Sequence, residues 1–398
     1  MNRPIRVLSL YEGFFAGGAR ILHTDVVAGL HGGAGQRHSV LSIASAARRD
    51  SSIQLLHKDP RYVRLTASGV EVRTLGRVGG ADAPDPSTFT ERQLRIAADA
   101  VRQADVILSL KEQPIGLLLA LRERGLMPDV PVAACLHRSD PGHSGPALSW
   151  LSEAASTGLL TAGISCAEST SAAYEPFLSP TTERFVVGNG IDTDRFRPGT
   201  EDEQESTRRR FGIPAAAPVV VLAARFDAMK NPGLFLRSAA LLAQQRPETH
   251  FLVCGAGMTL ENDAFRTLLL ESGISGATNL HALGLRDDMP TIYQIADIVA
   301  LTSAFGEASP LCLLEGAAAG ATPVTTDVGD SALTVRGIGF VTTHDPADIA
   351  ATWDGVLDRR AELRSHSLAA RPRLGRRRMI AEYAAVVSGL LRSNRVAA

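Results

Sequence analysis

The sequence contains almost no lysine. Of its 41 basic residues only Lys58, Lys111 and Lys230 are lysines, a bias typical of GC-rich coding that singles out these three side chains. Acidic and basic residues balance to a formal charge of -1. This balance leaves no basic surface of the kind that nucleic acids require, and there is no polybasic tail. No nucleic-acid partner is therefore expected.

Cysteine is also scarce. The four cysteines, Cys135, Cys166, Cys254 and Cys312, are scattered without a CxxC pair, so the sequence offers neither a zinc site nor a disulfide framework. No apolar run reaches the roughly 18 residues that a transmembrane helix needs. The start, MNRPIRVLSL, reads as a buried strand and lacks a signal-peptide pattern. A cytoplasmic protein without a bound metal is expected.

Apolar runs of strand length alternate with helical patterns along all 398 residues. This alternation is typical of α/β proteins with parallel sheets, and the length suits two domains. The expected strands of the first series are 6–10, 39–43, 70–74, 106–110 and 132–136, and those of the second are 219–224, 250–253, 279–282, 298–302 and 322–326. The pattern predicts two Rossmann-like domains that face one another across a cleft.

The domain boundaries follow from a polar segment, residues 197–214, which is flanked by prolines and is expected at the surface near the domain junction. Residues 1–195 are predicted to form an acceptor-binding domain and residues 196–375 a nucleotide-sugar-binding domain. The last helical pattern, within residues 376–398, is compatible with either domain. Packing against the amino-terminal domain is one arrangement.

Two glutamates stand out in the mostly apolar segment FGEASPLCLLEGAAAGATPV, residues 305–324. Glu307 is expected in the loop at the carboxyl end of a strand, where open α/β sheets bind ligands. Glu315 is expected inside the helix that follows. The two carboxylates can therefore reach the same crevice as hydrogen-bond acceptors for hydroxyl groups.

The start of that helix is a candidate anion site. Ser309 is a suitable N-cap and Pro310 suits the first helical position, which predicts a helix over residues 310–319. The backbone N–H groups of the first turn, including those of Leu311 and Cys312, favour a negatively charged group. An anion beside two carboxylates is typical of a nucleotide-sugar, which carries both a diphosphate and many hydroxyls.

The segment with Glu307 and Glu315 resembles the E-x7-E signature of retaining glycosyltransferases of the GT-B fold, family 4. Four other segments resemble motifs of that family in the same order. They are VVGNGIDTDRFRP (186–198), AARFDAMKNPGLFLRSAALL (223–242), FLVCGAG (251–257) and GLRDDMPTIYQIADIVALTSAFGE (284–307). The resemblance covers the carboxyl-terminal half of the chain closely and the amino-terminal half loosely.

The resemblance implies a donor site in the second domain. Glu307 would contact the hydroxyls of the donor sugar, and Glu315 would contact the ribose. Arg225 and Lys230 would neutralise the diphosphate leaving group, although a surface salt bridge is the ordinary role of either residue taken alone. Arg225, Lys230 and Glu307 are therefore predicted to be catalytic.

The first domain is expected to contribute the loop YEGFFAGGAR, in which Gly17 and Gly18 would lie over the donor phosphate. A tight strand-to-helix turn is the structural alternative. His137 matches a family histidine that faces donor sugar and acceptor, with a buried structural histidine as its rival. The predicted acceptor-binding residues are Glu12, Phe14, His137 and Asp140.

Two further motifs give weaker evidence of a functional site. Asp192-Thr-Asp194 has the D-x-D spacing of metal-dependent glycosyltransferases, but it lies in a segment expected to form an inter-domain turn, so no metal site is predicted there. Gly255-x-Gly257 lacks the third glycine and the distal acid of a dinucleotide fingerprint. No cofactor is predicted, because a nucleotide-sugar is a co-substrate.

The predicted function is transfer of a sugar, with retention, from an NDP-sugar, most simply a UDP-sugar, to an acceptor hydroxyl. The block LYEGFFAGGARILHTDVVAGLH resembles glycosyltransferases of aminoglycoside-antibiotic assembly, which implies a paromamine-like acceptor. An acidic lining from Glu12, Glu112 or Asp140 would suit such a polyamine. Two alternatives are a peripheral membrane transferase with a lipid-linked acceptor and a nucleotide-sugar-binding protein without turnover.

Overall fold

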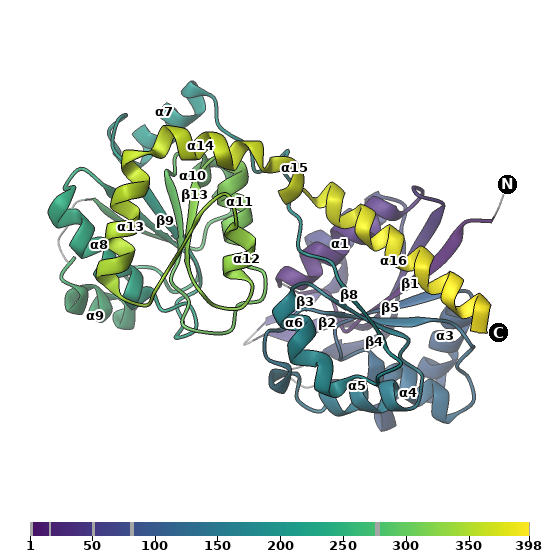
Figure 1. Cartoon of the computed structure of the whole chain (residues 1–398). Coiled ribbons are helices and arrows are strands. Elements are labelled where there is room, and N and C mark those ends of the chain that lie inside the picture. Colours follow the sequence, from purple (N-terminus) through teal and green to yellow (C-terminus); the bar gives the residue numbers. More distant parts are fainter. Residues whose placement is uncertain (1–2, 16, 50–51, 80–82, 275–278, 398) are drawn as a thin grey trace. The chain divides into compact units, whose positions relative to one another are not determined.

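The chain folds into two units, each a sheet covered by helices on both faces (Figure 1). This computed structural model describes residues 3–15, 17–49, 52–79, 83–274 and 279–397. The first unit combines Met1–Asn189 with Arg376–Ala398, and the second unit is Gly190–Gly375. Both sheets are largely parallel, as the alternation of strand and helix patterns predicted.

The sheet of the first unit has the order β3-β2-β1-β5-β6-β7-β8, with β4 on the free side of β2. Only β3 runs antiparallel to its neighbour. The central strands are buried along their whole length, which explains their uninterrupted apolar runs. The strands are β1 (Ile5–Tyr11), β2 (Gln36–Arg49), β3 (Ser52–Leu55), β4 (Glu71–Gly79), β5 (Val106–Leu110), β6 (Val132–Leu136), β7 (Ala162–Ser165) and β8 (Glu183–Val186).

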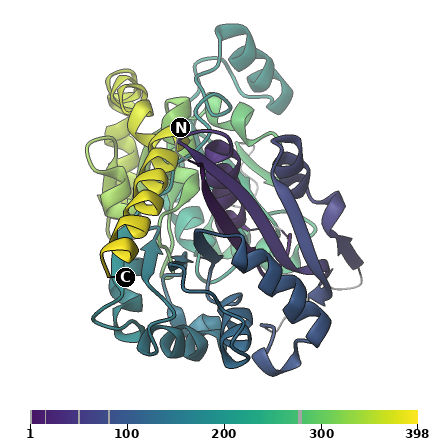
Figure 2. The same ribbon diagram turned by 90° about the vertical axis from the view of Figure 1, so that its right-hand side faces the viewer.

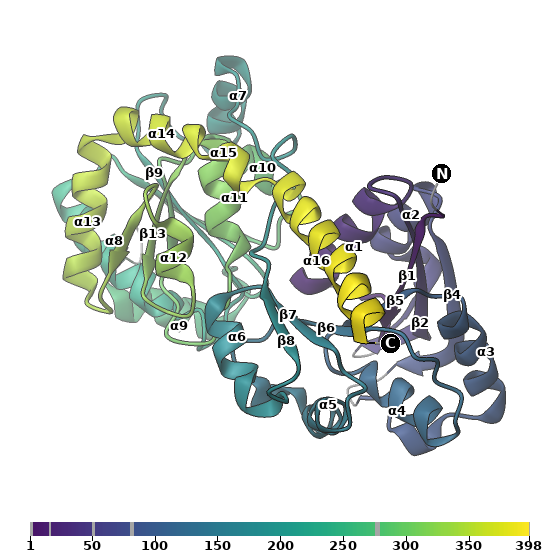
Figure 3. The ribbon, with the colours of Figure 1, turned by 45° about the vertical axis from the view of Figure 1, so that its right-hand side comes forward.

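Helices cover both faces of this sheet (Figure 3). One face carries α1 (Gly18–Leu30), α2 (Pro60–Ala67) and α16 (Arg376–Ala397), and the other carries α3 (Glu91–Arg102), α4 (Ile115–Glu123) and α5 (Ala147–Ser156). Helix α6 (Glu168–Tyr174) follows β7. Four short 3-10 turns complete the unit at Leu56–Lys58, Pro86–Thr88, Pro141–Ser144 and Glu175–Phe177.

The last helix of the chain belongs to the same unit as the first strand (Figure 2). Helix α16 packs along α1, and its side chains Met379, Tyr383 and Leu390 are buried. The fit is close, because a Cβ atom placed on Gly29 of α1 would lie 2.5 Å from Ile380. The part of α16 from Met379 to Leu390 thus contributes side chains to the core of the first unit.

The sheet of the second unit is wholly parallel, in the order β11-β10-β9-β12-β13-β14. The chain first adds β10 and β11 on one side of β9. It then crosses back and adds β12, β13 and β14 on the other side. The carboxyl ends of β9 and β12 therefore flank a topological switch point, where open α/β sheets bind ligands. The strands are β9 (Val219–Ala223), β10 (His250–Cys254), β11 (Leu280–Gly284), β12 (Ile298–Leu301), β13 (Thr322–Thr326) and β14 (Phe340–Thr342).

Two apolar clusters, one on each face, hold this sheet between its helices. One face carries α8 (Pro232–Gln245), α9 (Asp263–Ser272) and α13 (Pro346–Asp358), and the other carries α10 (Met289–Gln294), α11 (Leu311–Ala319) and α12 (Ser331–Val335). Trp353 of α13 is fully buried against Phe235 and Phe251. The remaining helices are α7 (Glu201–Phe211), α14 (Arg360–Ala369) and α15 (Arg371–Leu374).

The sequence-based prediction missed α7, which lies inside the polar segment 197–214. The helix exposes most of its residues and so lacks a strong apolar stripe. Its ends nevertheless carry clear signals, because Thr200 and Glu203 form a capping box and Gly212 ends the helix in the left-handed conformation. The short strands β3, β7, β8 and β14 were also not predicted. None of the described helices is long and apolar enough to cross a membrane.

We expect Gly255→Ala to destabilise the second unit by about 2 kcal/mol or more, because overpacking against a fixed backbone adds to an unfavourable conformation. Gly255 has a φ of 142°, and a Cβ atom on it would lie 1.8 Å from the carbonyl oxygen of Ala224. Urea unfolding measures the change. Gly355→Ala in α13 is the control, since nothing lies within 4 Å of its added Cβ. Equal stability of the two variants would contradict the expectation.

Candidate functional site

The second unit gathers its predicted site residues at the switch point. The loop after β9 carries Arg225 and Lys230, and the loop after β12 carries Glu307. A hydrogen bond from the backbone N–H of Ala304 to the carbonyl oxygen of Met229, 2.8 Å long, joins these two loops. Residues far apart in the chain are brought together because β9 and β12 are neighbours in the sheet.

Lys230 and Glu307 form a buried ion pair between the Lys230 ammonium and Oε1 of Glu307. The two side chains are 15% and 6% exposed. The Ser303 hydroxyl donates to the same carboxylate oxygen at 2.5 Å. A buried charge is costly unless it is paired and hydrogen-bonded, and here both charges are compensated. The pair fixes the position of both side chains at the carboxyl end of β12.

Arg225 has a different environment. Its guanidinium is 69% exposed and lies 3.1 Å from Oδ2 of Asp227. The other oxygen of Asp227 accepts a hydrogen bond of 2.9 Å from the backbone N–H of Lys230. Asp227 therefore links Arg225 to the Lys230 loop. Arg225 thus lies in the same loop as Lys230, with an exposed side chain.

Helix α11 begins one residue later than predicted. Leu311 is its first residue and Pro310 takes the N-cap position with extended backbone angles, so Ser309 is not the N-cap. The N-cap residue makes no side-chain hydrogen bond to the first turn of the helix. Because Pro310 has no side-chain acceptor, the N–H groups of the first turn are available to an external anion at the end of the loop that carries Glu307.

Cys312 lies between the predicted donor residues. Burial raises the pKa of its thiol to about 12, and the charges of Lys230, Glu307 and Glu315 all act on it. A thiol with that pKa stays neutral. Cys312 is therefore a packing residue between the two glutamates, in addition to contributing a backbone N–H group near the start of α11.

Glu315 has the most perturbed carboxylate of the second unit's predicted site. Burial raises its pKa to about 7, against the opposing effects of Arg195 and of the neighbouring Tyr293 hydroxyl. Tyr293 of α10 is fully buried. The carboxylate is thus poorly solvated, which suits a group that gains hydrogen bonds from ligand hydroxyls.

Glycines allow the backbones of the surrounding loops to approach one another closely. A Cβ atom on Gly329, in the loop after β13, would lie 1.8 Å from the carbonyl oxygen of Glu307. The loop with Gly255 and Gly257 packs in the same way on the loop after β9 and bonds it through a hydrogen bond of 2.8 Å from Phe226 to Ala256. The Gly-x-Gly pair is therefore explained by loop packing.

Asp192-Thr-Asp194 forms a turn at the start of the second unit. The Asp192 carboxylate accepts hydrogen bonds from the backbone N–H groups of Asp194 and Arg195, at 3.1 and 3.2 Å. This is the structural role that the surrounding motif predicted. Within the described part of the chain, no cluster of three or more His, Cys, Asp or Glu side chains could hold a metal ion.

The first unit has its own switch point, between β1 and β5. Glu12 follows β1 and pairs with the buried Arg20 of α1, at 3.0 Å. Arg20 also donates to the carbonyl oxygen of Gly13 at 2.8 Å and stacks on the ring of Phe15. Burial raises the pKa of Glu12 despite the nearby cation. Glu12 thus holds the loop after β1.

Lys111 and Glu112 follow β5. Glu112 is fully buried, accepts a hydrogen bond from the Tyr174 hydroxyl and lies 3.8 Å from Nε of Arg138. Burial, and then the positive charges of Arg138 and Arg20, lower the pKa of Lys111 to about 8. The carboxyl ends of β1, β5 and β6 therefore carry a cluster of charged groups. We refer to Glu12, Arg20, Lys111, Glu112 and Arg138 as the first-unit charge cluster.

His137 follows β6 beside this cluster. Burial and then Lys111 lower the pKa of His137 to about 3, so its imidazole is neutral at physiological pH. Its buried Nε2 atom has no hydrogen-bond partner in the described protein. A neutral imidazole with a free ring nitrogen can exchange a hydrogen bond with a ligand hydroxyl.

Other predicted residues of the first unit lie elsewhere or have structural roles. Phe14 is 2% exposed and packs on Tyr11 and Tyr62, which corrects its prediction as an acceptor-binding residue. Asp140 has a 60% exposed side chain that caps a 3-10 turn and pairs with His143, away from the charge cluster's ion pairs. Gly17 precedes α1 and Gly18 begins it, so both glycines lie where the strand β1 connects to the helix, and their approach to a donor phosphate stays a prediction.

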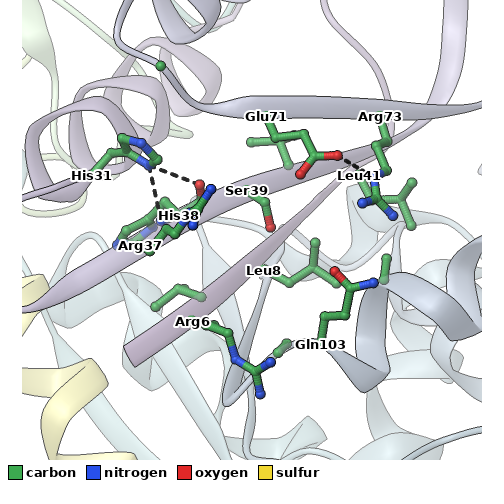
Figure 4. A pocket seen from close by; sticks show the side chains of 15 residues that line it. Arg6, Leu8, His31, Arg37, His38, Ser39, Leu41, Glu71, Arg73 and Gln103 are labelled. Carbon is green, nitrogen blue, oxygen red and sulfur yellow. Dashed lines mark hydrogen bonds and ion pairs between the residues drawn. The ribbon is translucent and has the colours of Figure 1, made fainter. Parts of the chain in front are cut away.

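A cavity of the first unit lies at the opposite edge of the sheet (Figure 4). It has a volume of about 240 Å³ and is lined by residues near the beginnings of β1, β2 and β4, among them Arg6, Arg37 and Arg73. Arg6 is paired with Asp105 and Arg73 with Glu71. Because the predicted acceptor residues follow the strand ends, this cavity is separate from them.

Sequence reasoning missed the residues that position the site. Ser303 and Asp227 hold Glu307 and Arg225, and Arg20 and Arg138 neutralise the acidic residues of the first unit. Asp227 stands inside the recognised motif and could have been considered as a partner of Arg225. Ser303 lies four residues before Glu307 in the same loop, and Arg20 lies eight residues after Glu12. Arg138 approaches Glu112 from the end of a different strand, and no local pattern marks that pair.

The second unit matches a known family. Residues 203–370 match the family model described as glycosyl transferases group 1. D-inositol 3-phosphate glycosyltransferases of Corynebacterium urealyticum and Salinispora arenicola are 37% and 34% identical over 149 and 186 residues. These alignments cover 36% and 43% of this chain, and 35% and 41% of the relatives. The chain thus spans less than half the length of these curated relatives.

Solved structures resemble the chain over nearly its whole length. HepE of Anabaena, in complex with UDP and glucose, has a TM-score of 0.73 and 18% identity, covering 96% of this chain and 99% of that chain. Sucrose-phosphate synthase of Thermosynechococcus elongatus has a TM-score of 0.67 and 17% identity, covering 99% and 100%. The chain therefore has the GT-B fold, as the motif resemblance predicted.

We expect Glu315→Gln to stabilise the protein at pH 8 by roughly 1–3 kcal/mol and to have little effect near pH 4.5. The folded-state pKa of about 7 lies above the ordinary value of 4.5, so the folded protein loses stability as pH rises through 7 and the carboxylate ionises. Urea unfolding across this pH range measures the difference. Glu203→Gln should behave oppositely, because its Arg197 partner lowers the pKa of Glu203 to about 2. A pH-independent effect of Glu315→Gln would contradict the assignment.

Proposed function

We propose that this chain is a retaining glycosyltransferase, which moves a sugar from a nucleotide-sugar, most simply a UDP-sugar, to a hydroxyl of a small polyhydroxylated acceptor. The observation that carries the proposal is the buried pair of Lys230 and Glu307 beside the uncapped start of α11. The family match of the second unit and the UDP complex of the similar structure support it.

The proposed donor site combines cations, N–H groups and carboxylates. Lys230, Arg225 and the first turn of α11 bind the diphosphate. Glu307 accepts hydrogen bonds from donor-sugar hydroxyls and Glu315 from the ribose. The pairing of Lys230 with Glu307 keeps both side chains at the site before the donor arrives, and the donor then offers a phosphate to one and hydroxyls to the other.

The proposed reaction needs no protein nucleophile. The acceptor oxygen forms its bond to the anomeric carbon on the same face from which the diphosphate leaves, so configuration is retained. The departing β-phosphate oxygen takes the bonding electrons and accepts the proton of the acceptor hydroxyl. The protein's contribution is to position both substrates and to stabilise the charge on the leaving diphosphate.

Charge balance underlies the proposal that the reaction is independent of metals. A diphosphate leaving group gains negative charge as the glycosidic bond breaks, and in this proposal Lys230, Arg225 and the α11 N–H groups compensate that charge. The Asp192 carboxylate already accepts hydrogen bonds in its turn. No cofactor is part of the proposal.

The acceptor class is proposed at the level of a cyclitol, a hydroxylated cyclohexane ring. The paromamine-like acceptor that the amino-terminal block suggests contains such a ring, and so does the D-inositol 3-phosphate after which the curated relatives are named. The acidic lining expected for a polyamine is weakened in the structure, because Glu12 pairs with Arg20 and Glu112 lies by Arg138. His137 remains a candidate for contact with acceptor hydroxyls.

We expect Lys230→Met to lower kcat/KM for UDP-sugar by about 10²–10³-fold, comparable to loss of one oxyanion donor. Loss of Lys230 also leaves Glu307 buried without its cation. UDP release in the presence of a cyclitol acceptor panel measures turnover. Lys58→Met removes an exposed lysine outside the site and should leave the rate unchanged. Equal rates for the wild type and Lys230→Met would overturn the donor assignment.

We expect turnover to persist in excess EDTA, and the product to keep the anomeric configuration of the donor. Proton NMR of the product reports the configuration directly. Loss of activity in EDTA that returns with Mn²⁺ or Mg²⁺ would exclude the metal-independent mechanism. Binding of UDP without turnover of any donor would favour the nucleotide-sugar-binding alternative.

A further inference from the structure

The backbone of Lys111 adopts a conformation that is rare for residues other than glycine. This residue follows β5 at the switch point of the first unit, and its φ of 68° is in the left-handed region that non-glycine residues rarely adopt. Two hydrogen bonds hold this conformation, from Lys111 N–H to the Cys135 carbonyl at 3.0 Å and from the Ser109 hydroxyl to the Lys111 carbonyl at 2.8 Å. Such strained residues cluster at functional sites.

The charges around Lys111 do not cancel. In the first-unit charge cluster, Glu12 pairs with Arg20 at 3.0 Å, and Glu112 lies 3.8 Å from Arg138. Lys111 forms no ion pair with any residue in the described ranges. Three cations thus face two carboxylates, and the neighbouring His137 is neutral. The uncompensated charge is the Lys111 ammonium, in a partly buried position.

Arg138 has hydrogen-bonding capacity that the protein does not use. Its Nε atom is buried and has no hydrogen-bond partner in the described protein, because Glu112 is too far away for a hydrogen bond. Burying a charged donor without an acceptor is costly. A ligand that supplies oxygen acceptors between Lys111 and Arg138 would satisfy both groups.

We propose that Lys111 and Arg138 form a subsite for an oxyanion group, a phosphate or a carboxylate, carried by the acceptor. This inference rests on the proposed function, because it places the acceptor at the carboxyl edge of the first unit's sheet. Lys111 supplies an ammonium and Arg138 a guanidinium, and neither group accepts hydrogen bonds. His137 then faces the uncharged hydroxyls of the same molecule.

The same arrangement disfavours a cationic acceptor. The ammonium groups of a polyamine would meet the unpaired Lys111 charge, and the carboxylates that could attract them are paired with Arg20 and Arg138 or bonded to Tyr174. Like charges in a partly buried site repel more strongly than in water. The charge cluster therefore selects between two acceptors that share a cyclitol ring.

Calorimetric titration of the full chain saturated with UDP tests this subsite. The probes are myo-inositol 1-phosphate, glucuronic acid, myo-inositol and paromamine. At least one of the two oxyanion-bearing probes is expected to bind about tenfold or more tightly than myo-inositol, since a hydrogen bond to a charged group contributes roughly 1.5–3 kcal/mol. The phosphate and the carboxylate probes distinguish the two kinds of oxyanion.

Variants assign the effect to residues. Lys111→Met should abolish the preference for the charged probe, and Lys111→Arg, which keeps the charge, should restore a part of it. Arg138→Gln should weaken the charged probe in the same direction. Arg37→Met is the matched control, because Arg37 is an exposed cation of the same unit and lines the separate cavity of Figure 4. UDP affinity should be unchanged in all four variants.

Three results would overturn the subsite. They are equal affinities for myo-inositol and both oxyanion probes, tightest binding of paromamine, and a preference that is lost in Arg37→Met but kept in Lys111→Met. Failure of the proposed function has a different signature. In that case UDP does not bind or no donor sugar is turned over, whichever acceptor probe is present.

Discussion

The buried ion pair between Lys230 and Glu307 is the constraint on which the arrangement of the second unit's site depends. It connects the loop after β9 with the loop after β12, and these loops flank the switch point of the sheet. Ionised groups lose hydration on burial, so the pair is stable only while Ser303 and Asp227 complete its surroundings. If either side chain is removed, the charge of the other stays buried without its partner, which is destabilising.

Both units carry charged residues at the switch point of their sheet, but the residues differ in kind. In each, charged residues follow the two strands that flank the switch point of the sheet. At that point the chain extends the sheet in opposite directions, and open α/β sheets bind ligands in the crevice that results. The second unit places Glu307 and Glu315 there, groups that accept hydrogen bonds from hydroxyls. The first unit places Lys111 there with an excess of positive charge. Similar sheets therefore carry different sets of charged groups at their switch points.

Much of the fold could be predicted from the sequence because buried parallel strands are marked by apolar runs. The bounds of β5, β6 and β13 match the predicted ranges, and the start of α8 at Asn231 and Pro232 matches its capping pattern. Short edge strands such as β14 carry too few residues for a pattern. Helix α7 lacks an apolar stripe and is marked only by its caps.

The site could be predicted less completely, and the reason is physical. Motif spacing located Lys230 and Glu307, but the charge state of a site depends on partners that spacing does not show. Glu12 was predicted to contribute an acidic lining, whereas Arg20, in the first turn of the helix that follows, neutralises it. Phe14 was predicted to bind the acceptor, but the fold buries its ring in the core. Such contacts arise from tertiary packing, which a local pattern does not encode.

The placement of α16 has a consequence for how the polypeptide assembles during synthesis. The second unit is a continuous stretch, Gly190–Gly375, and all of its described strands are synthesised before α16. The first unit is discontinuous in sequence, because α16, the helix that packs along α1, follows the whole of the second unit. The usual vectorial order, in which the amino-terminal domain is completed first, is therefore reversed for this topology. The nascent first unit must keep an apolar surface uncovered while the second unit already has every segment that it needs.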